Sequence, residues 1–505
     1  MDSTITLLCP VILLLIVPVL LILFLHKKQS PKPKLPPGPP KLPLIGNLHQ
    51  VGKLPHHSLW QLSQQHGPLL YLQLGQAPTI IISSSEMARQ VLRTHDLESC
   101  SRPSLFSSTK LSYGCSDVVF IPHGDKWREL RKTCMVELFG TKNNSTLQSI
   151  REEEVESMVT SISAAAVSSS SSMDCAIDLS DIFLSCANNI ILRVALGKRY
   201  QGTGKYEWSK LHMMLTEVQA ALGSFFMADY IPCFAWIDIL TGARARLDKI
   251  FYDLDAFYEL IIDEHLQQIM QSHGQDEDIL HTLLRLQKET DHLTNDNIKG
   301  VLMNIFVAGS DTSSASLEWT MAELMRNPEA MKKAQDEVRR VIGMKGKVEE
   351  SDLQQLQYLK WVLKESMRLH PPAPLLVHRE TTQRFKINGY EIQPKTRVIV
   401  NAWAIGRETS SWERPLEFYP ERFRDSSIDM KGHDFQLIPF GAGRRICPGM
   451  HLGIQTVELA LANLLYTFDW KCPDGSQDIN MDETPGVTVH KKYPLFLVPI
   501  KYELK

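Results

Sequence analysis

The chain lacks several features that would assign a protein to a class directly. Its 505 residues carry a formal net charge of only -3, so there is no excess of positive charge of the kind that nucleic acids bind. Its nine cysteines are odd in number, widely spaced and without a CxxC pair, which argues against a disulfide framework. No internal repeat is visible. With 43% apolar residues, the chain has ample material for a large globular core.

One apolar run stands at the amino terminus, where residues 5–25 read ITLLCPVILLLIVPVLLILFL. As a helix this run would span about 31 Å, against roughly 30 Å for the hydrocarbon of a bilayer. A cleaved secretory signal is the alternative, but no basic region precedes the run and no small-residue cleavage site follows it. Basic residues follow at once, so the positive-inside rule places the rest of the chain in the cytosol. We therefore expect a membrane anchor over residues 1–26, with a single transmembrane helix.

The remainder is expected to form one hinge and one domain. Residues 27–43 contain seven prolines, which fix the backbone and predict a stiff hinge. Residues 44–505 are predicted to be mainly α-helical, with helical periodicity over 86–370 and small peripheral β-sheets. A hairpin-like pair of strands is expected at 69–83, and the serine-rich run 161–173 is expected to be a loop.

The stretch PFGAGRRICPGM, residues 439–450, singles out one of the nine cysteines. Its glycines allow left-handed backbone angles and the close approach of a flat group, and Pro448 stiffens the turn. A helix beginning just after Cys447 would direct its positive end at the sulfur and favour thiolate. A lone cysteine cannot build a zinc or iron–sulfur cage, whereas one thiolate is sufficient for haem.

This stretch resembles the haem-binding signature of the cytochromes P450, FxxGxRxCxG, and it matches every fixed position, from Phe440 through Arg445 and Cys447 to Gly449. The resemblance extends over about residues 33–500 and is nearest to the plant A-type (family-71-like) microsomal branch. It implies the cytochrome P450 fold, with Cys447 as the axial ligand of the iron of haem b. The cysteine thiolate would donate electron density through the iron and so aid O–O cleavage.

A second motif, AGSDT at residues 308–312, lies in a long apolar helix. Gly309 is expected to thin this helix beside a ligand, and Asp311 and Thr312 are expected to organise a proton relay to bound oxygen. Taken alone, the same residues could be a solvent-facing patch or could bond back to their own helix. The resemblance to the oxygen-activation motif of the family favours the catalytic role for Asp311 and Thr312.

Two further motifs follow the family pattern. ESMR places Glu365 and Arg368 on one helix face, and with PERF the resemblance implies a buried structural network of Glu365, Arg368 and Arg422. In WRELR, the resemblance implies that Trp127 and Arg131 hold the haem propionates, together with Arg445 and a basic residue after the ESMR helix. His378 stands where relatives usually carry proline, so either His378 or Arg379 could supply this contact; we favour Arg379, whose guanidinium matches a carboxylate.

The substrate pocket is predicted by analogy, and for each residue core packing is the alternative. Expected lining residues are Phe120, Leu222, Phe226, Asn304, Ile305, Ala308, Leu375 and Val487, with Leu105, Val118, Phe225, Pro374, Leu376 and Gly486 beside them. The basic residues Lys126, Arg128 and Lys132 are either a solvated helix face or a docking patch for an acidic reductase.

The resemblance implies an enzyme of the endoplasmic reticulum membrane. It would be a haem-thiolate monooxygenase that oxidises a lipophilic plant specialised metabolite, such as a terpenoid, alkaloid or phenolic. Electrons would come from NADPH through the membrane-bound cytochrome P450 reductase, with cytochrome b5 as a further partner, and no nucleic acid is expected. The alternative is a haem-thiolate enzyme of oxidative cyclisation, rearrangement, or lyase or isomerase chemistry. The intact Asp311–Thr312 pair argues against a reaction that needs no oxygen.

Overall fold

The fold was examined in a computed structural model that describes residues 33–140, 144–168, 176–197, 208–271, 278–290, 292–473, 475 and 478–503. The predicted anchor and the start of the hinge lie outside these residues. The described helices are α2 (Pro55–His66), α3 (Ser85–Arg89), α4 (Asp96–Ser99), α5 (Phe106–Leu111), α6 (Asp125–Thr133), α7 (Asn144–Ser168), α8 (Leu179–Leu196), α9 (Trp208–Leu222), α10 (Ile237–Leu240), α11 (Ala243–Gln271), α12 (Ile279–Glu289), α13 (Asn295–Arg326), α14 (Pro328–Ile342), α15 (Gln357–Leu369), α16 (Ala402–Ile405) and α17 (Met450–Thr467).

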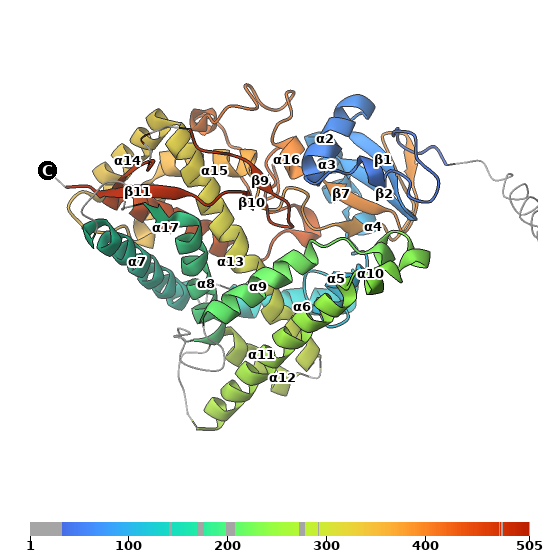
Figure 1. The fold of residues 1–505 in the computed structure, drawn as a ribbon, viewed down its shortest axis with the longest axis horizontal. Coiled ribbons are helices and arrows are strands. Elements are labelled where there is room, and N and C mark those ends of the chain that lie inside the picture. The colour runs from blue at the N-terminus through green and yellow to red at the C-terminus, as the bar shows by residue number, and fades with distance from the viewer. Residues whose placement is uncertain are drawn as a thin grey trace, which may run out of the picture.

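The long helix α13 forms the centre of the molecule. It begins with a capping box in which the Thr294 hydroxyl and the Asn297 backbone N–H pair, and it is buried along most of its 32 residues. A helix that is apolar on several faces must be covered on several faces, and α8, α15 and α17 pack against it. Figure 1 shows α13 running through the molecule from beside α14 and α15 toward α9, which crosses it.

The β-structure is peripheral, as predicted. The largest described sheet has the order β1-β2-β7-β4 and contains β1 (Leu69–Leu74), β2 (Ala77–Ile82), β4 (Arg379–Glu380) and β7 (Arg397–Val400). The remaining strands are β3 (Ile177–Asp178), β5 (Phe385–Ile387), β6 (Tyr390–Ile392), β8 (Phe468–Lys471), β9 (Glu483–Thr484), β10 (His490–Lys491) and β11 (Phe496–Lys501). The expected hairpin at 69–83 is confirmed, because β1 pairs with β2 antiparallel from Leu69↔Ile82 to Leu74↔Ala77.

One segment differs from the expectation. The serine-rich run was predicted to be a loop from residue 161, but α7 continues through Ser168. This continuation is packed, since Ile162 is fully buried against the main core. Among the described residues, the helix that is long and apolar enough to cross a membrane is α8, and it is largely buried inside the molecule. The apolar character of α8 is explained by its packing against α13.

Candidate active site

A cavity opens between α13 and α17, and Cys447 lines it. Its walls come from α8, α13, the segment after α15, the turn before α17 and the first turns of α17. The apolar lining includes Ala187, Ile190, Ile191, Val301, Ile305, Ala308, Met367, Leu376, Val377, Leu452 and Val457. Elements far apart in the sequence therefore enclose one apolar chamber, whose lining includes two cysteines, Cys134 and Cys447, together with Phe440 and Gly449.

The turn that carries Cys447 is fixed by its backbone. The Cys447 N–H donates to the Phe440 carbonyl oxygen at 3.0 Å. Gly441 and Gly443 have φ angles of +70° and +71°, a region that side chains disfavour. At Gly443 a Cβ would lie 2.3 Å from the carbonyl oxygen of Leu92. The glycines are thus required by the path of the turn and by its packing against the η2 segment (Gln90–Thr94).

The sulfur of Cys447 lies beside the start of α17, as expected. Burial raises the pKa of the Cys447 thiol, whereas the Gly449 backbone N–H and the positive charge of Arg131 act in the opposite direction. The helix start alone therefore does not make this sulfur a free thiolate. A bound metal cation would make the sulfur a thiolate, because coordination deprotonates a thiol outright. The buried sulfur also suits a metal ligand better than a nucleophile exposed to solvent.

Four arginines line the same cavity: Arg102, Arg131, Arg379 and Arg445. Arg379 pairs with Asp96 at 2.7 Å. The other three donate to backbone carbonyl oxygens, for example Arg131 to that of residue 446 at 2.6 Å and Arg445 to that of residue 121 at 2.7 Å. Burial lowers the pKa of Arg445 to about 10, and the charges of Arg379 and Arg131 add to this effect. Buried positive charge that is paired mainly with neutral oxygens favours an anionic ligand.

Trp127 of α6 supplies a matching hydrogen-bond donor. Its Nε1 atom is buried and has no hydrogen-bond partner in the described structure. The Arg445 guanidinium lies 4.3 Å from the centroid of the indole ring. A buried N–H group without a partner is costly, and an anionic oxygen placed beside Arg445 would satisfy it. Together with the arginines, this donor fits a ligand that presents carboxylates, as haem does.

The helix α13 is open toward the cavity at the AGSDT motif. Ala308 is exposed although the ten residues before it are buried, because it faces the cavity. Gly309 lines the cavity, and a Cβ there would lie 2.6 Å from Ile191 Cδ1, so this glycine also permits the close packing of α8 against α13. Thr312 lines the cavity, and its hydroxyl donates to the Ala308 carbonyl oxygen at 2.7 Å. Thr312 therefore lines the cavity and also bonds back to its own helix.

Asp311 lies on another side of α13 than its neighbour. Its carboxylate accepts a hydrogen bond from His490 at 2.9 Å. It borders a small polar cavity between α8, α9 and α13 rather than the cavity that Cys447 lines. The pairing of Asp311 with Thr312 in one relay was an expectation from their adjacency in sequence. One helical residue rotates the side chain by about 100°, which is why the two groups diverge.

Asn304 lines the cavity but uses its polar atoms within the protein. Its amide donates to Asp117 Oδ2 at 2.7 Å, and its oxygen accepts from the backbone N–H groups of Val118 and Val119 at 3.2 and 3.3 Å. Burial raises the pKa of Asp117 to about 6, although its hydrogen bonds from Asn304 and from the Phe120 and Ile121 backbone N–H groups oppose the rise. Asn304 therefore anchors the 117–121 segment to α13.

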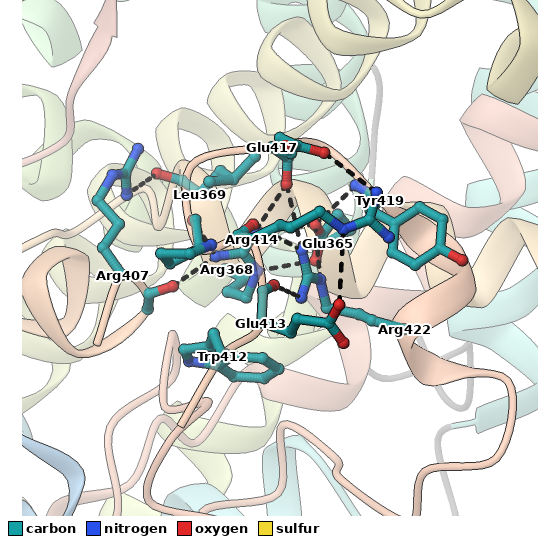
Figure 2. Close-up of polar contacts among 12 residues, drawn as sticks. Glu365, Arg368, Leu369, Arg407, Trp412, Glu413, Arg414, Glu417, Tyr419 and Arg422 are labelled. Atoms are coloured by element: carbon teal, nitrogen blue, oxygen red, sulfur yellow. Dashed lines mark hydrogen bonds and ion pairs between the residues drawn. The ribbon is translucent and has the colours of Figure 1, made fainter. Parts of the chain in front are cut away.

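Glu365, Arg368 and Arg422 form a buried network (Figure 2). The Arg368 fork donates to both oxygens of Glu365 at 2.8 Å, and Arg422 Nε donates to Glu365 Oε1 at 2.9 Å. The side chains of Glu365 and Arg368 are fully buried. The remaining donors of the two arginines tie the 406–417 segment to α15. They bind the backbone carbonyl oxygens of Gly406, Glu413, Arg414, Pro415 and Glu417.

Several predicted pocket residues lie outside the lining of the Cys447 cavity. Phe226 is buried against Phe106, with ring centroids 5.1 Å apart. Val487 is 39% exposed on the turn between β9 and β10. Phe120, Leu222 and Leu375 pack against core clusters. Ile305, Ala308 and Asn304 do line the cavity. Position along the chain relative to a motif was their only signal, and it does not determine which way a side chain points.

Of the two candidates after α15, Arg379 lines the cavity. Burial and the charges of Arg397 and Arg102 lower the pKa of His378 to about 4, so this imidazole is neutral. Sequence reasoning missed Arg102, whose guanidinium donates to the carbonyl oxygens of residues 119, 377 and 378. It also missed Asp96 and His490. None of the three lies in a periodic or spaced pattern, because each contacts its partner only across the fold.

A mainly helical fold in which a glycine-rich turn presents one cysteine to an apolar chamber edged with arginines defines a haem-thiolate protein. The sequence profile of the family "Cytochrome P450" matches residues 36–498, and the chain belongs to this family.

Plant enzymes of the same family are similar over nearly the whole chain. Cytochrome P450 71A1 of Persea americana is 49% identical over 462 residues, which cover 90% of this chain and 91% of that protein. Strychnine-11-hydroxylase of Strychnos nux-vomica is 47% identical over 471 residues, covering 92% and 91%. Among solved structures, a zebra fish cytochrome P450 with abiraterone has a TM-score of 0.76 at 25% identity, covering 90% of this chain and all of that one.

Family membership settles the reaction class. The chain is a cytochrome P450 monooxygenase, its cofactor is haem, and it depends on a redox partner for electrons and on a small substrate. One of these plant relatives is named as a strychnine hydroxylase.

Proposed function

We propose that this chain is a membrane-anchored monooxygenase that hydroxylates or otherwise oxidises a lipophilic plant specialised metabolite, using oxygen and electrons from NADPH. The observation that carries the proposal is the chamber itself. It places Cys447 at one edge, the Thr312 hydroxyl on a helix that crosses the fold, and mostly apolar side chains between them. An apolar chamber of this kind selects an apolar substrate.

The cavity residues would hold haem as follows. Cys447 would supply the thiolate that binds the iron, and the Gly449 N–H would steady its sulfur. Trp127, Arg131, Arg379 and Arg445 would hold the two carboxylates, and Phe440 and Gly449 would contact the cofactor. When bound, haem supplies the activation of molecular oxygen. The protein supplies the ligand, the charge balance and a chamber from which water is excluded.

The network of Glu365, Arg368 and Arg422 has a structural role in this proposal. It ties α15 to the segment that leads to the Cys447 turn, and the charges of Glu365 and Arg368 in it are fully buried. Breaking such a network is costly. We therefore propose that it keeps the turn in the shape that haem requires.

Thr312 holds a proton at its hydroxyl oxygen inside the cavity. In the described structure this hydroxyl bonds to the Ala308 carbonyl oxygen, and it can exchange that partner for a water molecule in the chamber. Asp311 is 17% exposed, so it can exchange protons with solvent. We propose that Asp311 supplies protons from outside and that Thr312 hands them on within the chamber.

The substrate would contact Ile305 and Ala308 within the chamber, with Asn304 holding the wall in place. Phe120, Leu222, Leu375 and Val487, which lie outside the lining of the chamber, remain proposed substrate contacts, whereas Phe226 is buried against Phe106. Strychnine-11-hydroxylase is named for a hydroxylated alkaloid, and we propose a substrate of comparable size and lipophilicity, such as an alkaloid, terpenoid or phenolic.

An exposed apolar surface supports attachment to a membrane. Leu42 and Leu44 are 49% and 70% exposed, and Trp236, Ile239 and Leu240 of the α10 region are 53%, 60% and 75% exposed. Both groups adjoin the turn between β1 and β2, since residue 75 donates to the carbonyl oxygen of residue 45 and residue 76 donates to that of residue 230. Such a patch marks an interaction site.

We therefore propose that residues 1–26 anchor the chain in the endoplasmic reticulum membrane, that residues 27–43 are the hinge, and that residues 44–505 are the cytosolic catalytic domain. Lys126, Arg128 and Lys132 are exposed on α6, the helix whose Arg131 contacts the Cys447 turn. This basic surface would receive an acidic partner, which we propose to be the NADPH-dependent reductase, with cytochrome b5 as a second donor.

The test is turnover by the full-length chain in yeast membranes that contain the reductase, against a panel of lipophilic plant metabolites. We expect a product that is oxidised and that forms only with both NADPH and oxygen. A product formed without oxygen would establish lyase or isomerase chemistry in place of monooxygenation. Replacing Cys447 with serine should abolish the red-shifted Soret band of the reduced carbon-monoxide complex, and survival of this band would refute Cys447 as the ligand.

A further inference from the structure

The strand β10 and the residue before it are attached to α13 at three successive positions. The Trp319 Nε1–H group donates to the Val489 carbonyl oxygen at 2.8 Å. The Lys491 backbone N–H donates to Glu318 Oε2 at 3.3 Å. His490 lies between these two contacts and reaches toward the AGSDT motif. The turn that precedes β10 therefore cannot move independently of the helix that carries Thr312.

His490 binds two carboxylates of α13. Its Nε2 atom lies 2.9 Å from Asp311 Oδ1, and its Nδ1 atom lies 3.5 Å from Glu318 Oε2. Asp311 and Glu318 are seven residues apart, which places them two turns apart on one helix face. Burial lowers the pKa of His490, but the hydrogen bonds and charges of the two carboxylates outweigh burial and raise the pKa to about 10. The ring is thus a cation at neutral pH.

The other side of the same turn contacts the end of α9. A Cβ on Gly223 would lie 3.4 Å from the Val487 backbone nitrogen. The turn at 485–489 is therefore packed between α13 and the end of α9. A displacement of this turn would therefore also move His490 and change its contact with Asp311.

We propose that His490 is a positioning residue for proton handling on α13: its cation fixes the orientation of the Asp311 carboxylate, which the helix places away from the Cys447 cavity, and ties it to the 485–489 turn. The inference rests on the proposed function, in which Asp311 supplies protons to the Thr312 region. His490 itself neither touches the chamber nor transfers a proton in this scheme.

The charge is the essential part of this role. Without it, Asp311 and Glu318 would be two partly buried carboxylates on one face with no cation between them, and Asp311 would turn toward solvent. Glutamine at position 490 retains a hydrogen-bond donor but no charge. Lysine retains the charge on a flexible stem, so it should restore the position of Asp311.

The experiment uses oxygen as its probe, so that the organic substrate need not be known. Full-length haem-loaded variants are combined with the reductase and NADPH, and NADPH oxidation per haem is measured in light and heavy water. We expect His490→Gln to slow NADPH oxidation about tenfold and to enlarge the solvent isotope effect, because proton delivery becomes limiting. His490→Lys should stay within about twofold of the wild type.

Two comparisons make the outcome specific. Lys492→Ala is the matched control, since Lys492 is the exposed neighbour that faces Asp482 at 3.6 Å; it should behave as the wild type does. Asp311→Asn combined with His490→Gln should be no slower than Asp311→Asn alone, because both act through one carboxylate. The absorbance of the reduced carbon-monoxide complex gives the concentration of intact haem protein in every variant. Rates expressed per haem are therefore independent of how much protein folds.

The possible failures are distinguishable. Wild-type rates and isotope effects in His490→Gln would overturn the positioning role while leaving the proposed function intact. Equal slowing in His490→Gln and His490→Lys would also overturn it, because the effect would then be structural. A wild-type chain that oxidises no NADPH with the reductase would overturn the proposed function and this inference with it.

Discussion

Replacing Arg368 with alanine is expected to remove about 3–5 kcal/mol of unfolding free energy. Arg368 supplies two of the four hydrogen bonds received by Glu365, and both side chains are fully buried. The substitution also deprives the carbonyl oxygens of Gly406, Pro415 and Glu417 of their donor. Each such loss costs on the order of 1 kcal/mol or more, so the total lies within the range for a broken buried pair.

The loss should appear in two measurements. Urea titration of the haem-loaded full chain, followed by the Soret band, should show the reduced midpoint, and the fraction of protein that incorporates haem on expression should fall. Arg368→Lys keeps the charge but not the planar fork, so we expect about half the loss. Arg424→Ala is the control, because Arg424 is exposed in the same segment. Unchanged stability and haem content in Arg368→Ala would refute the view that this network holds the turn.

Three further predictions follow from single contacts. Trp127→Phe removes the unpartnered Nε1–H. Haem transfer from this variant to added apomyoglobin should be about tenfold faster, a change equivalent to the loss of one charge-assisted hydrogen bond. An unchanged rate would mean that this group does not contact the cofactor. Gly309→Ala should destabilise the chain by about 1–3 kcal/mol, because its Cβ would meet Ile191, and Ile191→Ala should relieve the clash; a stable Gly309→Ala protein would contradict the packing. Burial raises the pKa of Glu458 to about 7, so its contribution to stability is present below pH 4.5 and is lost as the pH rises through 7. Glu458→Gln should therefore gain about 1–2 kcal/mol relative to the wild type between pH 5 and pH 8, after discounting for solvent screening, and parallel pH curves would disprove the shift.

The residues that could be identified from the sequence share one property: their partners lie within one or two helical turns or within one turn of the chain. Cys447 and its glycines form such a local unit, as do Glu365 with Arg368 and Trp127 with Arg131. Backbone angles, capping and i,i+3 or i,i+4 spacing determine these arrangements, and the sequence contains all of that information. The mainly helical class and the β1–β2 hairpin were predictable for the same reason.

Contacts between distant segments were not predictable in this way. Arg102 reaches the cavity because residues 100–121 and 372–379 pack together, and nothing in its neighbourhood marks it as a buried cation. Phe226 faces Phe106 although its position suggested the substrate chamber. In each case the direction of the side chain depends on which elements happen to cover it.

The AGSDT motif shows both kinds of determination in five residues. The sequence alone placed Thr312 on a long buried helix and identified a threonine next to an aspartate as a candidate for proton chemistry. Only the tertiary structure decided that Gly309 accommodates Ile191, that Thr312 faces the chamber of Cys447, and that Asp311 is held by His490, 179 residues further along the chain. Local spacing fixes which residues share a helix, whereas the packing of other elements around that helix fixes what each of its faces does.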